Sequence, residues 1–194
     1  MSKEIMQIEI DQAMLTAIEI KLKNLHKQTP RVLRNSINRT ATETLRRIKK
    51  GRSAGYTIKA GEFNKEIKVQ RANASHLDAT IRAKGPVRTI KNFKTKDTKA
   101  GIKTDITKTG LKSLVNDAGA KVFIATGGKV NGLYVQRETK DRYPLRVLHA
   151  NSVPKMVKKI YEGKRGDQGE MEDFIKKTLT KNISRQIDKI LGGK

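Results

Sequence analysis

The stretch Ala120–Met156, AKVFIATGGKVNGLYVQRETKDRYPLRVLHANSVPKM, decides the fold that the sequence predicts. In it, β-branched residues, aromatic residues and leucine recur near period two, which favours half-buried strands. The three expected strands are Lys121–Thr126, Leu133–Arg137 and Tyr143–Leu148. The first two are joined by GGKVNG, in which Gly127, Gly128 and Gly132 can adopt positive φ at little cost, so we predict a hairpin.

A helix is expected directly after the third strand. Asn151-Ser152-Val153-Pro154 has the composition of a helix start, with a capping residue followed by proline in the first turn. Apolar residues then recur at helical spacing, at Met156, Val157 and Ile160. Strand, hairpin, strand and helix therefore form one predicted module.

Two helices are predicted before this module. A short strand or extended arm over Ile5–Ile10, on its alternating isoleucines, precedes Asp11, which can cap a helix that stops near Gln28. The apolar positions of that helix are Leu15, Ile18, Leu22 and Leu25. Thr29-Pro30 starts a second helix that is expected to run through Lys50 and end at Gly51. Its stripe consists of Leu33, Ile37, Ala41, Leu45 and Ile48.

The middle of the chain indicates two further hairpins. The connector that follows the second helix has Tyr56 and Ile58 as anchors, and a helical turn is expected over Gly61–Lys65. The first hairpin pairs Ile67–Arg71 with Leu77–Ala83 and ends at Gly85-Pro86. The second is expected in Arg88–Lys112, with strand anchors at Ile90, Phe93, Ile102 and Ile106 and an exposed basic tip over Thr95–Gly101.

The C-terminal part is predicted to be a loop followed by a helix. The loop is Glu162–Gly169, and Asp167-Gln168-Gly169-Glu170 has the spacing of a capping box. The stripe of the helix runs from Phe174 to Leu191, and this helix can pack on the core or on a neighbouring subunit. The expected fold class is α+β: an antiparallel sheet of hairpins packed with a long N-terminal amphipathic helix, plus a C-terminal helix. We divide the chain into an N-terminal arm and helix (1–28), a core domain (29–162) and a C-terminal helical extension (163–194).

The composition indicates a subunit that binds anionic partners. The 194 residues suffice for one domain with helical arms, but only 36% are hydrophobic and 4% aromatic, against 32% charged. The net charge is +24, from 43 Lys and Arg against 19 Asp and Glu. Such a field favours phosphate backbones, anionic surfaces or acidic proteins, and does not choose among them. The acidic residues near the N-terminus argue against a signal peptide, and the lack of any long apolar run argues against membrane insertion.

No constellation of catalytic or metal-binding residues is visible. Cysteine is absent, which excludes thiol nucleophiles, disulfides and cysteine-ligated metals. The three histidines, His26, His76 and His149, lie in separate segments without acidic residues at ligand spacing. Because nucleotide-binding and hydrolase motifs are absent as well, we expect no enzyme activity, no cofactor and no metal. A hydrolase of unknown type would require a cleft with perturbed carboxylates.

Basic residues in two regions are the candidates for contact with a partner or with DNA. One region is the polar face of the second helix, and the other runs from the second predicted hairpin into the opening stretch. The candidates are Arg31, Arg34, Arg39, Arg46, Arg47, Arg88, Lys91, Lys94, Lys96, Lys99, Lys103, Lys129 and Arg137. The alternative interpretation is a solvated helix face and a flexible loop. The absence of zinc-finger, basic-zipper and aromatic RNA-binding motifs limits any DNA contact to backbone phosphates.

In the order of several short segments, the sequence resembles the minor tail protein Z family of long-tailed phages. The segments are VLRNSINRT (32–40), IKVQRA (67–72), IKNFK (90–94), KAGI (99–102), FIAT (123–126), GLYVQR (132–137), RYPLRVL (142–148) and SVP (152–154). The resemblance covers roughly Val32 to Val157. It departs from the family pattern at Ala150-Asn151, where a Gly-Pro pair often precedes Ser-Val-Pro.

The resemblance implies a structural virion protein of the tail or neck, which stays in the host cytoplasm during assembly. Related tail-completion and neck proteins form rings, commonly sixfold, around the DNA channel at the head-proximal end of the tail. The implied partners are further copies of the chain in a hexameric ring, the tail terminator and other neck or tail proteins, the tape measure protein, and DNA contacted through its phosphates. The rival prediction is a cytosolic basic nucleic-acid-binding architectural protein.

Overall fold

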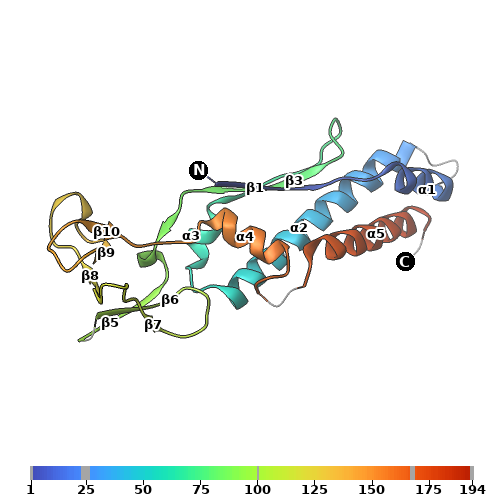
Figure 1. Cartoon of the computed structure of the whole chain (residues 1–194). Coiled ribbons are helices and arrows are strands. Elements are labelled where there is room, and N and C mark those ends of the chain that lie inside the picture. The colour runs from blue at the N-terminus through green and yellow to red at the C-terminus, as the bar shows by residue number, and fades with distance from the viewer. Residues whose placement is uncertain (1, 23–26, 100, 167–168, 193–194) are drawn as a thin grey trace.

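The computed structural model describes residues 2–22, 27–99, 101–166 and 169–192. It shows an elongated molecule in which the long helices lie at one end and a group of small sheets at the other (Figure 1). We call residues 88–150, which form those small sheets, the β lobe. Helices and antiparallel sheets occur together, so the α+β prediction is confirmed.

The helices are organised around one long central helix. They are α1 (Gln12–Leu22), α2 (Thr29–Gly55), α3 (Ala60–Asn64), α4 (Val153–Tyr161) and α5 (Met171–Ile190). Both α4 and α5 pack against α2, and α5 runs antiparallel to it (Figure 1). The predicted caps form: Asp11 Oδ1 accepts a hydrogen bond from the backbone N–H of Met14 (2.7 Å), and Ser152 Oγ accepts one from that of Lys155 (3.4 Å).

One predicted helix end is wrong, and the other falls partly outside the described residues. α1 is described from Gln12 to Leu22, and residues 27–28, near which the first helix is expected to stop, form a 3₁₀ turn before α2. Residues 23–26, which include the predicted anchor Leu25, lie outside the described residues. α2 continues beyond Gly51 to Gly55. Gly51 serves packing here, because a Cβ on Gly166 would lie 2.6 Å from its Cα.

The first sheet has the strand order β1-β3-β2, and all its pairs are antiparallel. Its strands are β1 (Ser2–Ile8), β2 (Ile67–Gln70) and β3 (Ala79–Gly85), so the first predicted hairpin is confirmed. The expected isoleucine alternation in the N-terminal strand is wrong. Met6 and Ile8 are buried, whereas Ile5 is 46% exposed, because β1 pairs with β3 in the register that places Met6 opposite Ile81.

The β lobe is inserted in the chain between β3 and α4. Its strands are β4 (Arg88–Thr89), β5 (Lys94–Thr98), β6 (Gly101–Asp105), β7 (Lys112–Ser113), β8 (Val122–Ile124), β9 (Tyr134–Arg137), β10 (Leu145–Val147) and β11 (His149–Ala150). They form the sheets β5-β6-β7 and β10-β9-β8 and the pair β11-β4. The chain thus enters and leaves the lobe through two strands that pair with each other. Ile90, Ile102 and Val122 form a small core of their own.

The predicted strand–hairpin–strand–helix module is confirmed, with one correction in its loop. Gly128 and Gly132 adopt positive φ (66° and 71°), but Gly127 is extended at −168°. The loop contains a 3₁₀ turn, η3 (Gly128–Val130). The peptide bond between Tyr143 and Pro144 is cis.

The second predicted hairpin is also present but is longer than expected. Thr95–Thr98 belong to β5, so the described tip is reduced to Lys99, and Ala100 lies outside the described residues. Ile90 lies in a 3₁₀ turn, η2 (Ile90–Asn92), and Phe93 follows it, so neither is the strand anchor that the sequence predicted. Both are buried.

One hydrophobic cluster joins distant parts of the chain. It includes Ile18 of α1, Ile37 of α2, Met156 of α4 and Ile183 of α5, so all three segments of the sequence-based division contribute to it. Of the two alternatives for the last helix, packing on the core of its own chain is observed. Glu170 caps α5 without a side-chain hydrogen bond, and Asp167 of the expected capping box lies outside the described residues.

Candidate polyanion-binding surface

The outward face of the β5–β6 hairpin carries three lysines close together. Lys96 and Lys103 are directly opposite each other in the antiparallel register, and Lys94 lies two residues along the same face. The other face is turned inward, where Ile102 and Thr104 are buried. We call Lys94, Lys96, Lys99 and Lys103 the basic hairpin.

No described acidic residue forms an ion pair with the basic hairpin. Asp105 is opposite Lys94 in the register, but it is only 7% exposed and its Oδ1 accepts a hydrogen bond from the backbone N–H of Thr109 (3.1 Å). Like charges directly opposite each other destabilise a strand pair, by an amount on the order of the 0.2–1 kcal/mol of a favourable cross-strand pair. An anion bound between the two lysines would turn this repulsion into a net attraction.

The polar face of α2 forms a second basic surface, at a distance from the first. Arg31, Arg34, Arg39 and Arg46 are exposed, and Arg39 Nε is paired with Glu43 Oε1 at 3.1 Å. Arg47 does not belong to this face. Its guanidinium carbon lies 4.2 Å from the centre of the Phe174 ring on α5. The basic hairpin and the start of α2 are at opposite ends of the molecule (Figure 1), so the structure does not bring the two sets together.

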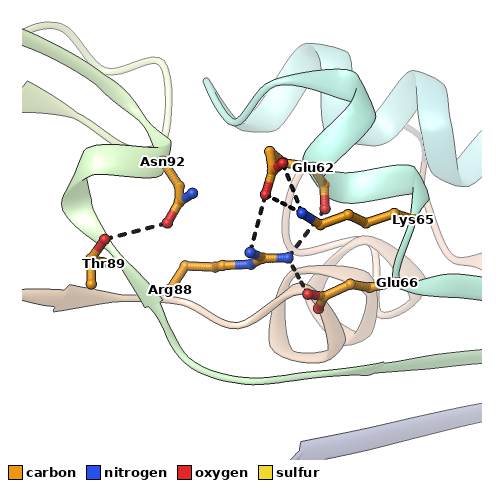
Figure 2. Close-up of polar contacts among 6 residues, drawn as sticks. All are labelled: Glu62, Lys65, Glu66, Arg88, Thr89 and Asn92. Atoms are coloured by element: carbon orange, nitrogen blue, oxygen red, sulfur yellow. Dashed lines mark hydrogen bonds and ion pairs between the residues drawn. The ribbon is translucent and has the colours of Figure 1, made fainter.

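Arg88 is engaged inside the chain. Figure 2 shows its guanidinium between the two carboxylates of Glu62 and Glu66. Nη1 is 3.1 Å from Glu62 Oε2, Nη2 pairs with Glu66 Oε1, and the side chain is 11% exposed. Lys65 Nζ also pairs with Glu62, at 2.8 Å. Arg88 therefore anchors the start of the β lobe to α3 and does not face an external partner.

The two carboxylates around Arg88 have opposite pKa shifts. The hydrogen bond from Lys65 is the main cause that lowers the pKa of Glu62 below its ordinary value. Burial is the main cause that raises the pKa of Glu66 above its ordinary value, against the attraction of Arg88. Glu66 sits tightly beneath Gly85, where any Cβ would collide with its carboxylate. The hydrogen bond from Lys65 and the burial of Glu66 account for the two pKa shifts, so we do not assign this cluster a catalytic role.

The remaining sequence-predicted residues are scattered over the β lobe. Lys91 Nζ donates a hydrogen bond to the carbonyl oxygen of Gly132 (3.2 Å), which ties η2 to the loop before β9. Lys129 is exposed in η3. Arg137 is exposed on β9, with its guanidinium carbon 5.8 Å from the centre of the Phe123 ring. They are cations on the surface of the lobe, but they do not converge with the basic hairpin on one point.

The structure also reveals a cleft that the sequence did not predict. It has a volume of about 680 Å³ and lies where the end of α2 and the start of α3 meet the β5–β6 hairpin. Its cationic residues are Arg52, Lys59, Lys94 and Lys108. Only Lys94 was a predicted contact residue. The others are single lysines or arginines in connecting segments, and no local pattern in the sequence marks them as neighbours.

Metal-binding and membrane-spanning features are not found in the part of the chain that the structure describes. Within residues 2–22, 27–99, 101–166 and 169–192, no three acidic or histidine side chains are grouped so that they could hold a metal ion. None of the helices described is long and apolar enough to cross a membrane.

Comparison of the chain with protein-family models, curated proteins and solved structures gives no match.

Proposed function

We propose that this chain is a structural protein of a tailed phage, a ring-forming tail-completion or neck component at the head-proximal end of the tail. Its role would be to join copies of itself around the DNA channel and to contact anionic neighbours through its basic surfaces. The phage assignment rests on the resemblance over Val32–Val157. The observation that carries the contact with a polyanion is the pairing of Lys96 with Lys103 on an exposed face without a neutralising acid.

The open sheet edges support self-assembly. In the order β1-β3-β2, both β1 and β2 have one edge that is not paired with another strand of this sheet. β1 is seven residues long and has Ile5 exposed, which is the kind of edge that natural proteins usually cover or pair. In a closed ring, a neighbouring copy would pair with such an edge and bury its apolar side chain. The implied partners beyond the ring are the tail terminator, other neck or tail proteins, the tape measure protein and the DNA.

The rival proposal is a cytosolic basic nucleic-acid-binding architectural protein. The same basic hairpin favours it, since phosphate contacts need only exposed cations. It predicts that the isolated chain binds free duplex tightly and with a steep salt dependence, and that it does so without forming a ring. The phage proposal predicts rings or association with purified tails, and weaker binding of free duplex.

The test compares two quadruple variants. The first is Lys94→Gln, Lys96→Gln, Lys99→Gln and Lys103→Gln. The control is Lys68→Gln, Lys155→Gln, Lys177→Gln and Lys181→Gln, which removes the same charge from exposed lysines of β2, α4 and α5. In a phage that depends on the chain, the first variant should abolish tail completion or infectivity with the fold intact by circular dichroism, and the control should retain both. Unchanged titre with the first variant would refute the proposed contact.

Negative-stain imaging of the purified chain, alone and with isolated tails, tests the assembly itself. Closed rings, or density added to the head-proximal end of tails, support the phage proposal. A monomer that does not bind tails but binds free duplex tightly would favour the architectural protein instead.

A further inference from the structure

The cleft at the junction of α2 and the β lobe brings together cations from four separate segments. Arg52 comes from the last turn of α2, Lys59 from the residue before α3, Lys94 from β5 and Lys108 from the loop after β6. No described acidic residue forms an ion pair with any of them. The one acid in the lining, Asp105, is buried and accepts a backbone hydrogen bond. The cleft therefore has a concentrated positive charge.

Backbone and side-chain hydrogen bonds hold the walls of the cleft in place. Thr57 connects them: its backbone N–H donates to the carbonyl oxygen of Ile106 (3.2 Å), and its hydroxyl donates to that of Asp105. The same hydroxyl oxygen accepts a hydrogen bond from the backbone N–H of Lys94 (3.1 Å). Arg52 Nη1 donates to the carbonyl oxygen of Ile58 at 3.0 Å. Because these bonds join the segment after α2 to β5 and to the end of β6, the backbone that carries the cations is held in place without a ligand.

One residue of the lining has an unusual backbone conformation. Among the described residues, Lys108 is the one non-glycine with positive φ (56°). This conformation is strained for a residue with a side chain, and such residues occur preferentially at functional sites.

We propose that this cleft is a binding site for phosphate groups, and that its ligand in the assembled virion is the phosphodiester backbone of the DNA in the channel. Three lysines and an arginine against one engaged acid leave a surplus that a single carboxylate would not neutralise, whereas successive phosphates would. The two aromatic residues of the lining, Tyr56 and Phe93, are 1% and 6% exposed, so bases have no ring to stack on. Recognition is consequently independent of base sequence.

The assignment of channel DNA as the ligand rests on the proposed function. The assignment of the cleft as a phosphate-binding site does not. A free polyphosphate and a nucleic-acid backbone present the same chemistry. The probes are therefore a fluorescent 20-base-pair duplex, in one AT-rich and one GC-rich version, and inorganic tripolyphosphate. A polyglutamate peptide serves as the carboxylate probe.

The variant is Lys59→Gln with Lys108→Asn. Both side chains are exposed, and asparagine tolerates positive φ better than lysine, so the fold should survive. The control, Lys68→Gln with Lys155→Gln, removes the same charge from exposed lysines that do not line the cleft. Lys94 is left intact, so that the basic hairpin and the cleft are tested separately.

We expect the variant to weaken binding of both duplexes equally and to reduce the slope of log K against log salt by about one for each lysine that is lost. The control should leave the slope near that of the parent chain. Tripolyphosphate should compete with the duplex on the parent chain, and polyglutamate should not. If tripolyphosphate binding alone depends on Lys59 and Lys108, the phosphate site stands and its ligand is a free polyphosphate.

The inference is overturned if variant and control lose equal affinity, since the general field of the protein would then explain binding, or if polyglutamate competes as well as tripolyphosphate. Ring formation, followed by negative stain on the same variants, is a separate readout. Rings without phosphate binding would refute the cleft alone. Phosphate binding without either rings or association with isolated tails would refute the proposed function alone.

Discussion

Asn182 on α5 donates a hydrogen bond from its side-chain amide to the hydroxyl oxygen of Thr40 on α2, over 3.1 Å. Both residues are almost completely buried, and the Thr40 hydroxyl in turn donates to the carbonyl oxygen of Ser36 (2.9 Å). This side-chain hydrogen bond joins the two antiparallel helices inside their interface, where an unpaired amide would carry a full desolvation cost.

The Asn182–Thr40 pair should show energetic coupling. Thr40→Val leaves the amide of Asn182 without its acceptor, so we expect a loss of about 1–3 kcal/mol in the free energy of unfolding. Asn182→Ala should cost a similar amount. In urea denaturation, the double variant should cost less than the sum of the two by about 0.5 kcal/mol or more. Strictly additive losses would show that the contact does not contribute.

The contact between Gly166 and Gly51 yields a second prediction. Gly166 has a φ of 88°, and a Cβ there would lie 2.6 Å from the Cα of Gly51. Gly166→Ala therefore combines a left-handed backbone with an overlap, and we expect it to lower the free energy of unfolding by about 2–4 kcal/mol.

Gly61→Ala on α3 is the matched control, since no atom lies within 4 Å of its added Cβ. It should be neutral or stabilising by up to about 1 kcal/mol. Thermal unfolding of the two variants checks both expectations. Equal melting temperatures would show that the glycine contact is not tight in solution.

Local periodicity and capping residues in the sequence predict where helices begin and which of their faces are buried. The stripe that contains Leu33, Ile37 and Ile48 identifies the buried face of α2, and Ser152 and Pro154 locate the start of α4. Such patterns state that a face is covered, but not which element covers it. The pairing of β1 with β3 is therefore not predictable. The sequence predicts a helix end at Gly51, whereas the structure shows that this glycine allows the close approach of Gly166.

The candidate site was predictable only where its residues follow one another in the chain. Lys94, Lys96 and Lys103 belong to one hairpin, so their alternation places them on one face. Arg88 looked the same in sequence, yet it is buried by Glu62 and Glu66, which precede it by more than twenty residues. The cleft unites segments from Arg52 to Lys108 and depends on tertiary structure alone.

Arg47 and Arg46 are neighbours on α2 with opposite expected behaviour. Arg47 packs against the Phe174 ring at 4.2 Å, whereas Arg46 is exposed. Arg47→Ala removes a partly desolvated cation–π contact and the packing of its aliphatic stem, so we expect a loss of about 1–2 kcal/mol. Arg46→Ala should stay within about 0.5 kcal/mol of the parent chain. Chemical denaturation of both variants decides this, and equal effects would contradict the assigned packing.

Lys96→Glu should improve stability and impair function at once. It turns the repulsive pair with Lys103 into an attractive one, so the free energy of unfolding should rise by about 0.2–1 kcal/mol at low salt, and the gain should shrink as salt screens it. Duplex binding and tail completion should both weaken. Lys68→Glu on β2 faces Arg82 in the register and provides the matched control, with a similar gain in stability but no loss of function. A destabilised Lys96→Glu chain would contradict the observed strand register.

The buried pair of Arg88 and Glu66 predicts a pH dependence of a definite sign. Burial raises the pKa of Glu66 in the folded chain above its ordinary value of 4.5, so between these two pKa values the folded state binds more protons than the unfolded state. The contribution of Glu66 to stability is therefore complete below the unfolded pKa and is lost as the pH rises through the folded pKa.

Glu66→Gln cannot take up this proton. The parent chain should consequently lose stability relative to the Glu66→Gln variant as the pH rises from 4.5 through the raised pKa, in urea denaturation at a series of pH values. Glu62 is the internal contrast, because its pKa is lowered and the contribution of its charge is lost as the pH falls. Arg88→Met, which leaves the Glu66 carboxylate buried without its cation, should cost about 3–5 kcal/mol at neutral pH and less in acid. A loss that is independent of pH would mean that Glu66 carries no buried charge.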